Sequence, residues 1–345
     1  MPGRRWVLTI LLALAAALGY GGSDFAAGLA ARGASVIRIT ILAEAVSVVV
    51  LLLTVPWVSS QPPSLSSVTW SVVGGLSGVT GAMALYMGFR HAAFSVAAPV
   101  SAVASAGFSV LAGLAFGEHP TALSLAGIIL ALPAIVGVSV SSSGQASPAV
   151  SGTGPAGPGP EFPEEPGTTA TAAVTAPAVV AGQPPAGAAG EPRGGSGAAT
   201  TASTGRHGAG VLWGLIAGAG FGVLFIGLNQ AGSGHDLWPL AIAQLAALIL
   251  VAGFGAVRGH LRLPPRRAGW LAAITGVTGA AGSLCFFVAT HQGLLAVTAV
   301  ITSLYPASTI LLARLLLGER LTAIRIAGLA LAAASVALIA VGGAG

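Results

Sequence analysis

Ten apolar stretches, each long enough to cross a lipid bilayer, constrain this chain more than any other feature. A bilayer core about 30 Å thick requires about 20 apolar residues in a helix, because each residue adds about 1.5 Å. Only 7% of the residues are charged, whereas roughly 25% are charged in soluble domains. The sequence therefore predicts an all-α integral membrane protein with helices near residues 6–30, 35–58, 68–89, 95–116, 121–140, 210–230, 237–257, 268–290, 296–317 and 322–341.

The two halves of the chain repeat each other at an offset of 201 residues. The run GEHPTALSLAG at residues 117–127 returns as GERLTAIRIAG at residues 318–328. The same offset relates further glycine pairs, among them Gly19 and Gly220, Gly21 and Gly222, Gly78 and Gly279, and Gly81 and Gly282. This self-similarity indicates an internal duplication. Each copy holds five predicted helices, an odd number, so the copies are expected to have opposite orientations, as in transporters that open one central site to each side in turn.

Each copy carries Gly-Glu between its fourth and fifth predicted helices. Glu118 and Glu319 are expected to be structural turn residues near the start of the next helix, where the helix dipole favours negative charge. A threonine follows each of them, and its hydroxyl is expected to cap that next helix.

Between the copies, the composition shifts to Gly, Pro, Ala, Ser and Thr. This composition predicts a disordered linker. The expected division is therefore a first repeat at 1–140, a linker at 141–207 and a second repeat at 208–345.

The paired turns, the duplicated halves and the run GGSDFAAGLAARGAS at residues 21–35 together resemble the drug/metabolite transporter superfamily, in its ten-helix bacterial form built from two EamA-type repeats. The resemblance covers both halves but not the linker. It implies ten membrane helices in two inverted repeats and secondary transport of a small organic solute across the cytoplasmic (inner) membrane of the cell. Export is the implied direction, driven by protons or by the solute gradient. The short motifs do not identify the solute.

The distribution of arginines predicts a membrane orientation opposite to the one that the resemblance implies. The resemblance implies that both termini are cytoplasmic, and Arg4 and Arg5 lie at that end. The opposite end, without the linker, holds eight arginines, and the positive-inside rule would make that end cytoplasmic. The eight are Arg32, Arg90, Arg258, Arg262, Arg266, Arg267, Arg320 and Arg325.

Asp24 and Glu44 are the acids within predicted helices. A charged acid inside the membrane costs about 3 kcal/mol, so such residues usually face a cavity or a partner. We expect them to bind protons or a cationic solute, with an ion pair between Glu44 and Arg38 as the alternative. The second half has Phe225 in place of Asp24 and Gln244 close to the position of Glu44.

Other candidate binding residues are amides and aromatic side chains. Asn229 and Gln244 are expected either to hydrogen-bond a solute or to join helices. Tyr305 precedes Pro306, which should kink the ninth helix. The predicted aromatic walls of a central cavity, with ordinary packing as the alternative, are Tyr20, Tyr86, Tyr305, Phe221, Phe286 and Phe287.

Motifs for catalysis, ATP hydrolysis or metal binding are absent from the sequence, and the six histidines have no ligand spacing. We therefore expect no enzyme activity, no cofactor, no metal and no nucleic-acid partner. The expected partners are a small solute, lipid and protons, and the oligomeric state stays open. Two other classes stay open: a membrane enzyme using Arg90, His91 and His291 on lipid-linked substrates, and a sensor or scaffold docking through the linker.

Overall fold

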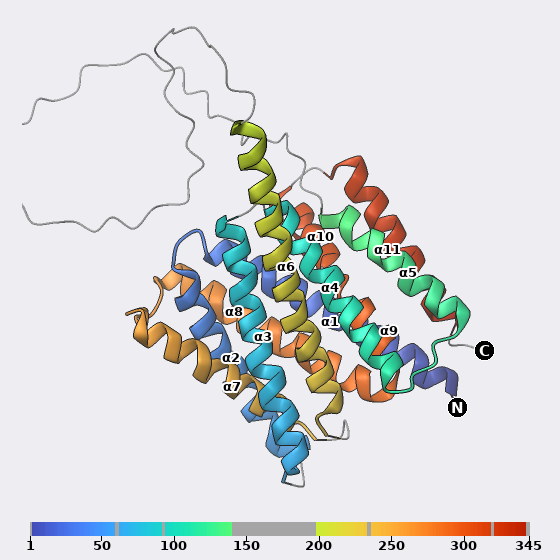
Figure 1. Ribbon diagram of the computed structural model, residues 1–345. Coiled ribbons are helices and arrows are strands. Elements are labelled where there is room, and N and C mark those ends of the chain that lie inside the picture. Colours follow the sequence, from blue (N-terminus) through green and yellow to red (C-terminus); the bar gives the residue numbers. More distant parts are fainter. Residues whose placement is uncertain are drawn as a thin grey trace, which may run out of the picture. The chain divides into compact units, whose positions relative to one another are not determined.

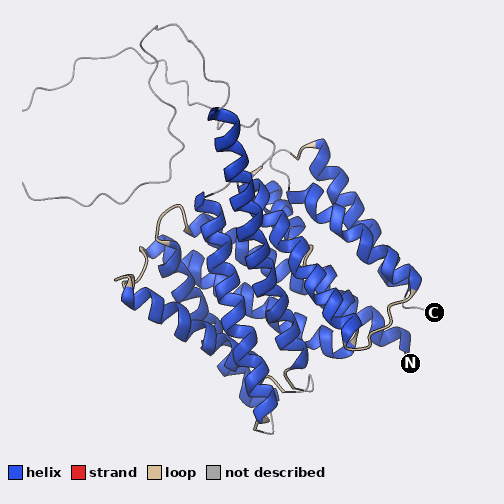
Figure 2. Cartoon of the chain, viewed as in Figure 1, coloured by secondary structure: helices blue, strands red, loops and turns tan. Residues whose placement is uncertain are grey.

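The computed structural model describes residues 2–58, 62–91, 94–139, 198–232, 236–318 and 321–342, and every regular element in them is a helix (Figures 1 and 2). The first half forms α1 (Pro2–Ala30), α2 (Val36–Val58), α3 (Leu65–His91), α4 (Phe94–Ala115) and α5 (Ala122–Ser139). The second half forms α6 (Ala198–Gln230), α7 (Trp238–Val257), α8 (Arg266–Gln292), α9 (Leu295–Thr302), α10 (Tyr305–Leu317) and α11 (Ala323–Gly342). Nine stretches of the described chain are long and apolar enough to cross a membrane, and Pro99–Ala115 is a shorter apolar helix. The predicted all-helical membrane fold is confirmed.

Two helices differ from their predicted outlines. The ninth predicted helix is interrupted after Thr302, so that α9 and α10 together form one span. Pro306 lies in the first turn of α10, where the missing N–H would have had no helical acceptor, and the predicted distortion is confirmed. α6 begins at Ala198, inside the predicted linker and ahead of its apolar run. The remainder of the predicted linker lies outside the described residues.

The contact between α5 and α11 shows that the two halves have opposite orientations. These helices are the last ones of their halves, and they lie side by side (Figure 1). Ser335 donates a hydrogen bond of 2.8 Å to the carbonyl of Gly127, near the start of α5. Gly137, near the end of α5, packs against Gly328, near the start of α11. Equivalent helices that pack antiparallel belong to repeats that are inverted relative to each other.

Two glycine crossings show the same relationship within the bundle. A Cβ added to Gly19 of α1 would lie 2.7 Å from the Cα of Gly282 in α8. A Cβ added to Gly220 of α6 would lie 2.7 Å from the Cα of Gly81 in α3. The offset of 201 residues converts the first crossing into the second. The halves therefore contact each other as the subunits of a twofold dimer do, with each contact made twice.

The Gly-Glu turn after α4 ties the two halves together. Gly117 has a φ of +87°, a left-handed conformation that favours glycine, and Glu118 N–H donates to the carbonyl of Gly113 at 2.9 Å. The Glu118 carboxylate then accepts hydrogen bonds from the backbone N–H groups of Leu295 and Ala296, the latter at 2.9 Å.

That carboxylate lies at a helix N-terminus, as expected, but the helix is α9 of the other half rather than the adjacent α5. α5 is capped by Thr121 instead, whose hydroxyl accepts a bond of 3.2 Å from Ser124 N–H, as predicted. Glu319 lies outside the described residues.

The close crossing of α3 and α6 can be tested with one methyl group. We expect Gly220→Ala to destabilise the protein by about 1–3 kcal/mol, because the added Cβ would press on backbone. Gly253→Ala in α7 is the control: a Cβ there meets nothing within 4 Å, and alanine favours a helix by about 1 kcal/mol. Thermal unfolding in detergent compares the variants. Equal midpoints would contradict the close crossing.

The tie made by Glu118 gives a second prediction. We expect Glu118→Gln to lower the free energy of unfolding by about 1–3 kcal/mol. The neutral amide has one acceptor oxygen and no negative charge, whereas the carboxylate accepts both backbone hydrogen bonds with charged oxygens. His119→Gln, which changes the exposed neighbour in the same turn, is expected to have little effect. Unfolding midpoints in detergent measure both variants, and an unaltered midpoint for Glu118→Gln would show that the tie contributes nothing.

Candidate functional site

Glu44 and Gln244 meet between α2 and α7. The Gln244 side-chain amide donates a hydrogen bond of 3.1 Å to Oε2 of Glu44. Glu44 lies about 12 Å from the start of α2, and Gln244 about 9 Å from the start of α7, which begins at the opposite end of the bundle. The contact is therefore deep in the membrane. The alternative ion pair with Arg38 is not formed, since Arg38 instead lines a pocket at the start of α2.

A crossing of α2 with α8 holds Glu44 in place. Ser47, one turn beyond Glu44, donates a hydrogen bond of 2.8 Å to the carbonyl of Gly276. Gly276 in turn leaves no room for a side chain against the backbone of Ala43. Ala43 and Ser47, which lie before and after Glu44 on α2, both pack on α8 of the other half and so position the acid.

Tyr20 extends the site from α1 to α8. Its hydroxyl lies 3.1 Å from Oγ of Ser283. Its ring tilts against Phe225 at 6.3 Å, and Phe225 stacks on Phe286 at 4.4 Å. Phe286 and Phe287, both predicted wall residues, are fully buried in an apolar cluster. Ser283 could not be identified from the sequence, because a serine within an apolar helix carries no signal of its partner.

Asp24 is an exposed acid on α1. It lies four residues after Tyr20 and so shares that residue's helix face, which is directed toward α8. The large exposed apolar residues of α1, Leu11 at 58% and Leu18 at 59%, lie on a different face that suits lipid. Asp24 and Tyr20 are therefore on the inner side of α1, with the acid nearer the end at which α1 meets α2.

Exposure falls along this inner side. Asp24 is exposed, Tyr20 and Glu44 are half-buried, Phe225 is 4% exposed and Phe286 is 0% exposed. The order runs from the arginine-rich end of the helices toward the end that holds the termini. Beyond Glu44, the aromatic side chains of Phe225 and Phe286 are buried.

The hydrogen bonds of Asn229 go to residues other than Glu44 and Gln244. Its amide donates to Oγ1 of Thr290 at 2.9 Å and to the Thr290 carbonyl at 3.3 Å, while its oxygen accepts from Gln230 at 3.0 Å. These contacts correspond to the alternative in which the amide joins helices.

Tyr305 is the first residue of α10, and its carbonyl packs against Gly21, the residue after Tyr20. It packs with an apolar cluster of α4, α5, α10 and α11, and its carbonyl accepts a bond of 3.2 Å from Thr309. The main chain of Tyr86 belongs to α3, but its side chain lies outside the described residues.

Of the groups considered for an enzyme, the side chain of His291 lies within the described residues. The ring nitrogens of His291 lie 2.8 Å from the carbonyl of Phe287 and 3.3 Å from that of Gly232. The side chains of Arg90 and His91 lie outside the described residues. Within the described chain, no three His, Cys, Asp or Glu residues are grouped as metal ligands would be.

Residues 208–341, which include α7 to α11 and most of α6, match the EamA-like transporter family. The chain carries an EamA-like transporter domain. This domain and the apolar, membrane-length helices of the described chain support a multi-pass membrane transporter. The EamA-like domain contributes Phe225, Gln244 and Ser283, whereas Asp24 and Glu44 come from the half outside the match.

No curated protein sequence matches the chain. A solved structure titled "Crystal structure of protein" is similar to it with a TM-score of 0.61 and 16% identity, over 94% of this chain and 97% of that one. This likeness shows that the fold extends beyond the EamA-like domain to nearly the whole chain.

The gradient of exposure can be measured with single cysteines in a Cys285→Ser background. We expect Asp24→Cys to react with a membrane-impermeant thiol reagent on the order of tenfold or more faster than Leu18→Cys or Ala280→Cys, because only a hydrated thiol ionises. Leu18 is the lipid-facing control, and Ala280, 1% exposed, is the buried one. Reaction should occur from one side of sealed vesicles only. Equal rates at the three positions would place Asp24 outside an aqueous path.

Proposed function

We propose that the chain is a secondary transporter that moves a small organic solute outward across the cell membrane by alternating access, coupled to protons through Glu44 and Asp24. The observation that carries this proposal is the contact between Glu44 and Gln244. It joins nearly equivalent positions of two inverted repeats deep in the membrane, which is where transporters built in this way bind their solute.

The chemistry of Glu44 suits a shared site for a proton and a solute. A carboxylate in the membrane costs about 3 kcal/mol unless it is paired, so it gains either a proton or a cationic partner. The Gln244 amide donates to the ionised form, and the rest of its surroundings offer hydroxyl and aromatic groups. A solute with a cationic or hydrogen-bond-donating group and an apolar portion fits this combination.

Alternating access follows from the repeat relationship. In the described state, side chains become less exposed from Asp24 toward Phe286, so the path we propose opens at the arginine-rich end. Exchange of conformation between the halves would close that end and open the end that holds the termini. The layer of Phe225, Phe286 and Phe287 and the Glu118 tie to α9 must part in that change.

The acids are expected to act in one half only. Phe225 takes the place of Asp24 and Gln244 lies one position from the counterpart of Glu44, so one titratable pair serves both open states. A solute and a proton that compete for Glu44 cannot both occupy it, and such competition exchanges one for the other across the membrane.

Proton release from purified protein tests the proposal directly. A panel of amines, amino acids and other metabolites is added in weak buffer, and released protons are measured. We expect at least one solute to release protons from the wild type. We expect no solute to release protons from Glu44→Gln, because the glutamine side chain has no titratable proton. Asp236→Asn is the matched control: it also removes one acid, yet asparagine retains the bond that Asp236 accepts from Trp238 N–H at 3.1 Å.

Solute binding without proton release, unchanged in Glu44→Gln, would remove Glu44 from the mechanism. A folded protein in liposomes that moves no solute under any imposed gradient would overturn the proposed transport.

A further inference from the structure

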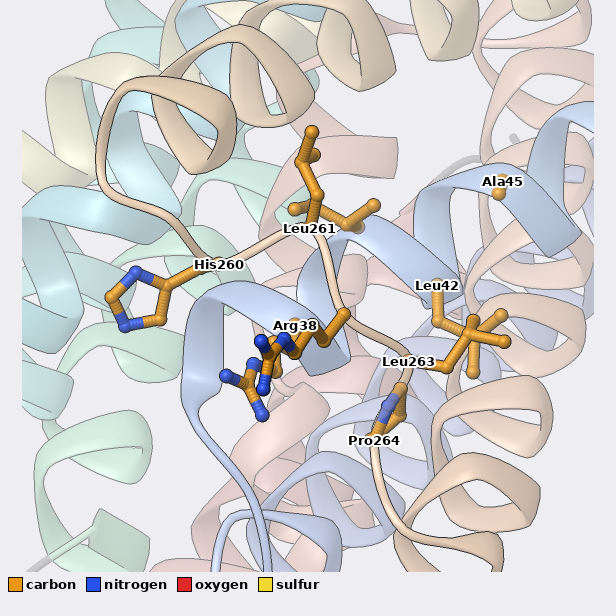
Figure 3. Close-up of a pocket in the computed structure, with 9 residues that line it drawn as sticks. Arg38, Leu42, Ala45, His260, Leu261, Leu263 and Pro264 are labelled. Atoms are coloured by element: carbon orange, nitrogen blue, oxygen red, sulfur yellow. The ribbon is translucent and has the colours of Figure 1, made fainter.

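A pocket of about 110 Å³ lies between the start of α2 and the loop that joins α7 to α8 (Figure 3). Its lining extends along α2 as far as Ala45, but neither Glu44 nor Gln244 lines it. Its lining residues are Arg38, Ile41, Leu42, Ala45, His260, Leu261, Arg262, Leu263 and Pro264. Two arginines and a histidine are thus combined with apolar side chains, and no carboxylate is among them.

The positive charge of this pocket is uncompensated. Nε of Arg38 is buried and has no hydrogen-bond partner among the described residues. A buried donor without an acceptor costs about 1–3 kcal/mol, and more when it is charged, so its presence calls for an anionic partner. Arg262 lines the same pocket from the loop, and Nδ1 of His260 lies 2.6 Å from the carbonyl of Arg258, which fixes its ring.

The position of the pocket suits an amphiphile. α7 and α8 both span the membrane, and the loop between them, residues 258–265, therefore lies at the bilayer surface. Beside the arginines, Leu261 and Leu263 are 60% and 78% exposed, and Val257 at the end of α7 is 86% exposed. Apolar side chains with this exposure at a membrane surface are expected to contact acyl chains.

We propose that Arg38 and Arg262 bind the phosphate of an anionic phospholipid headgroup. The guanidinium fork matches phosphate oxygens in pairs, and basic pockets between membrane helices are suited to lipid phosphates. The volume is below the range of roughly 300–1,000 Å³ typical of sites for whole small molecules. A headgroup phosphate fills such a space while its chains stay in the bilayer against Leu261 and Leu263.

Lipid retention measured by native mass spectrometry tests this site. The purified full chain in detergent is mixed with phosphatidylglycerol or with phosphatidylcholine, which has the same phosphodiester but no net charge. We expect the wild type to retain phosphatidylglycerol in preference, and Arg38→Gln/Arg262→Gln to lose most of that preference. Arg266→Gln/Arg267→Gln is the matched control, since it removes two exposed arginines at the same end that do not line the pocket.

Three outcomes would overturn the proposal. The first is an equal loss of bound phosphatidylglycerol in Arg38→Gln/Arg262→Gln and in Arg266→Gln/Arg267→Gln. That result would mean that the lipid is attracted to surface positive charge in general and not to the pocket. The second is retention of the lipid by Arg38→Gln/Arg262→Gln. The third comes from inorganic phosphate added without lipid: if it raises the unfolding midpoint of the wild type as much as phosphatidylglycerol does, the pocket is a site for free anions. Arg38→Lys/Arg262→Lys, which keeps the charge, serves if the glutamine variant does not fold, and it should show a weaker preference than the wild type because lysine lacks the paired fork.

Discussion

Close approach of helix backbones at glycine is the interaction on which the rest of this structure depends. Lipid gives membrane helices no hydrophobic reason to associate, so packing must come from small residues that let backbones touch. The crossing of Gly19 with Gly282 joins the two halves and also places Tyr20 beside Ser283, the residues that follow them. The crossing of Gly276 with Ala43 likewise sets the position of Glu44. Structural contacts between the halves and the polar contacts of the candidate site are therefore the same feature of the fold.

The twofold relationship of the backbone is not matched by the chemistry of the side chains. Glycines recur at equivalent positions at the crossing of α1 with α8 and of α6 with α3, but the acids in mid-helix, Asp24 and Glu44, occur in the first half only. Backbone symmetry serves the exchange of conformations between the halves, whereas a single charged centre serves both open states. The EamA-like domain in residues 208–341 thus provides half of the fold, while the acids come from the other half.

Much of the fold was predictable because it is encoded locally. Apolar runs of membrane length predicted the helices within a few residues, except for the start of α6. Pro306 predicted the interruption between α9 and α10, and the odd number of helices in each repeat predicted the inversion. Contacts between distant helices were not predictable in this way. Glu118 was expected at the adjacent helix and instead reaches α9, because its direction depends on how the halves pack. Gln244 was recognised as near the counterpart of Glu44, but no spacing within one helix could show that the two side chains touch.

The antiparallel contact of α5 with α11 bears on how such a protein can arise. A single five-helix half would require a second copy that is inserted in the membrane with the opposite orientation. A cell that made one such polypeptide would have to insert it in both orientations in equal amounts. Fusion of two halves in one chain guarantees one copy of each orientation. It also frees each copy to diverge, so that one can keep an aspartate, Asp24, where the other has Phe225, a difference that two products of one sequence could never acquire.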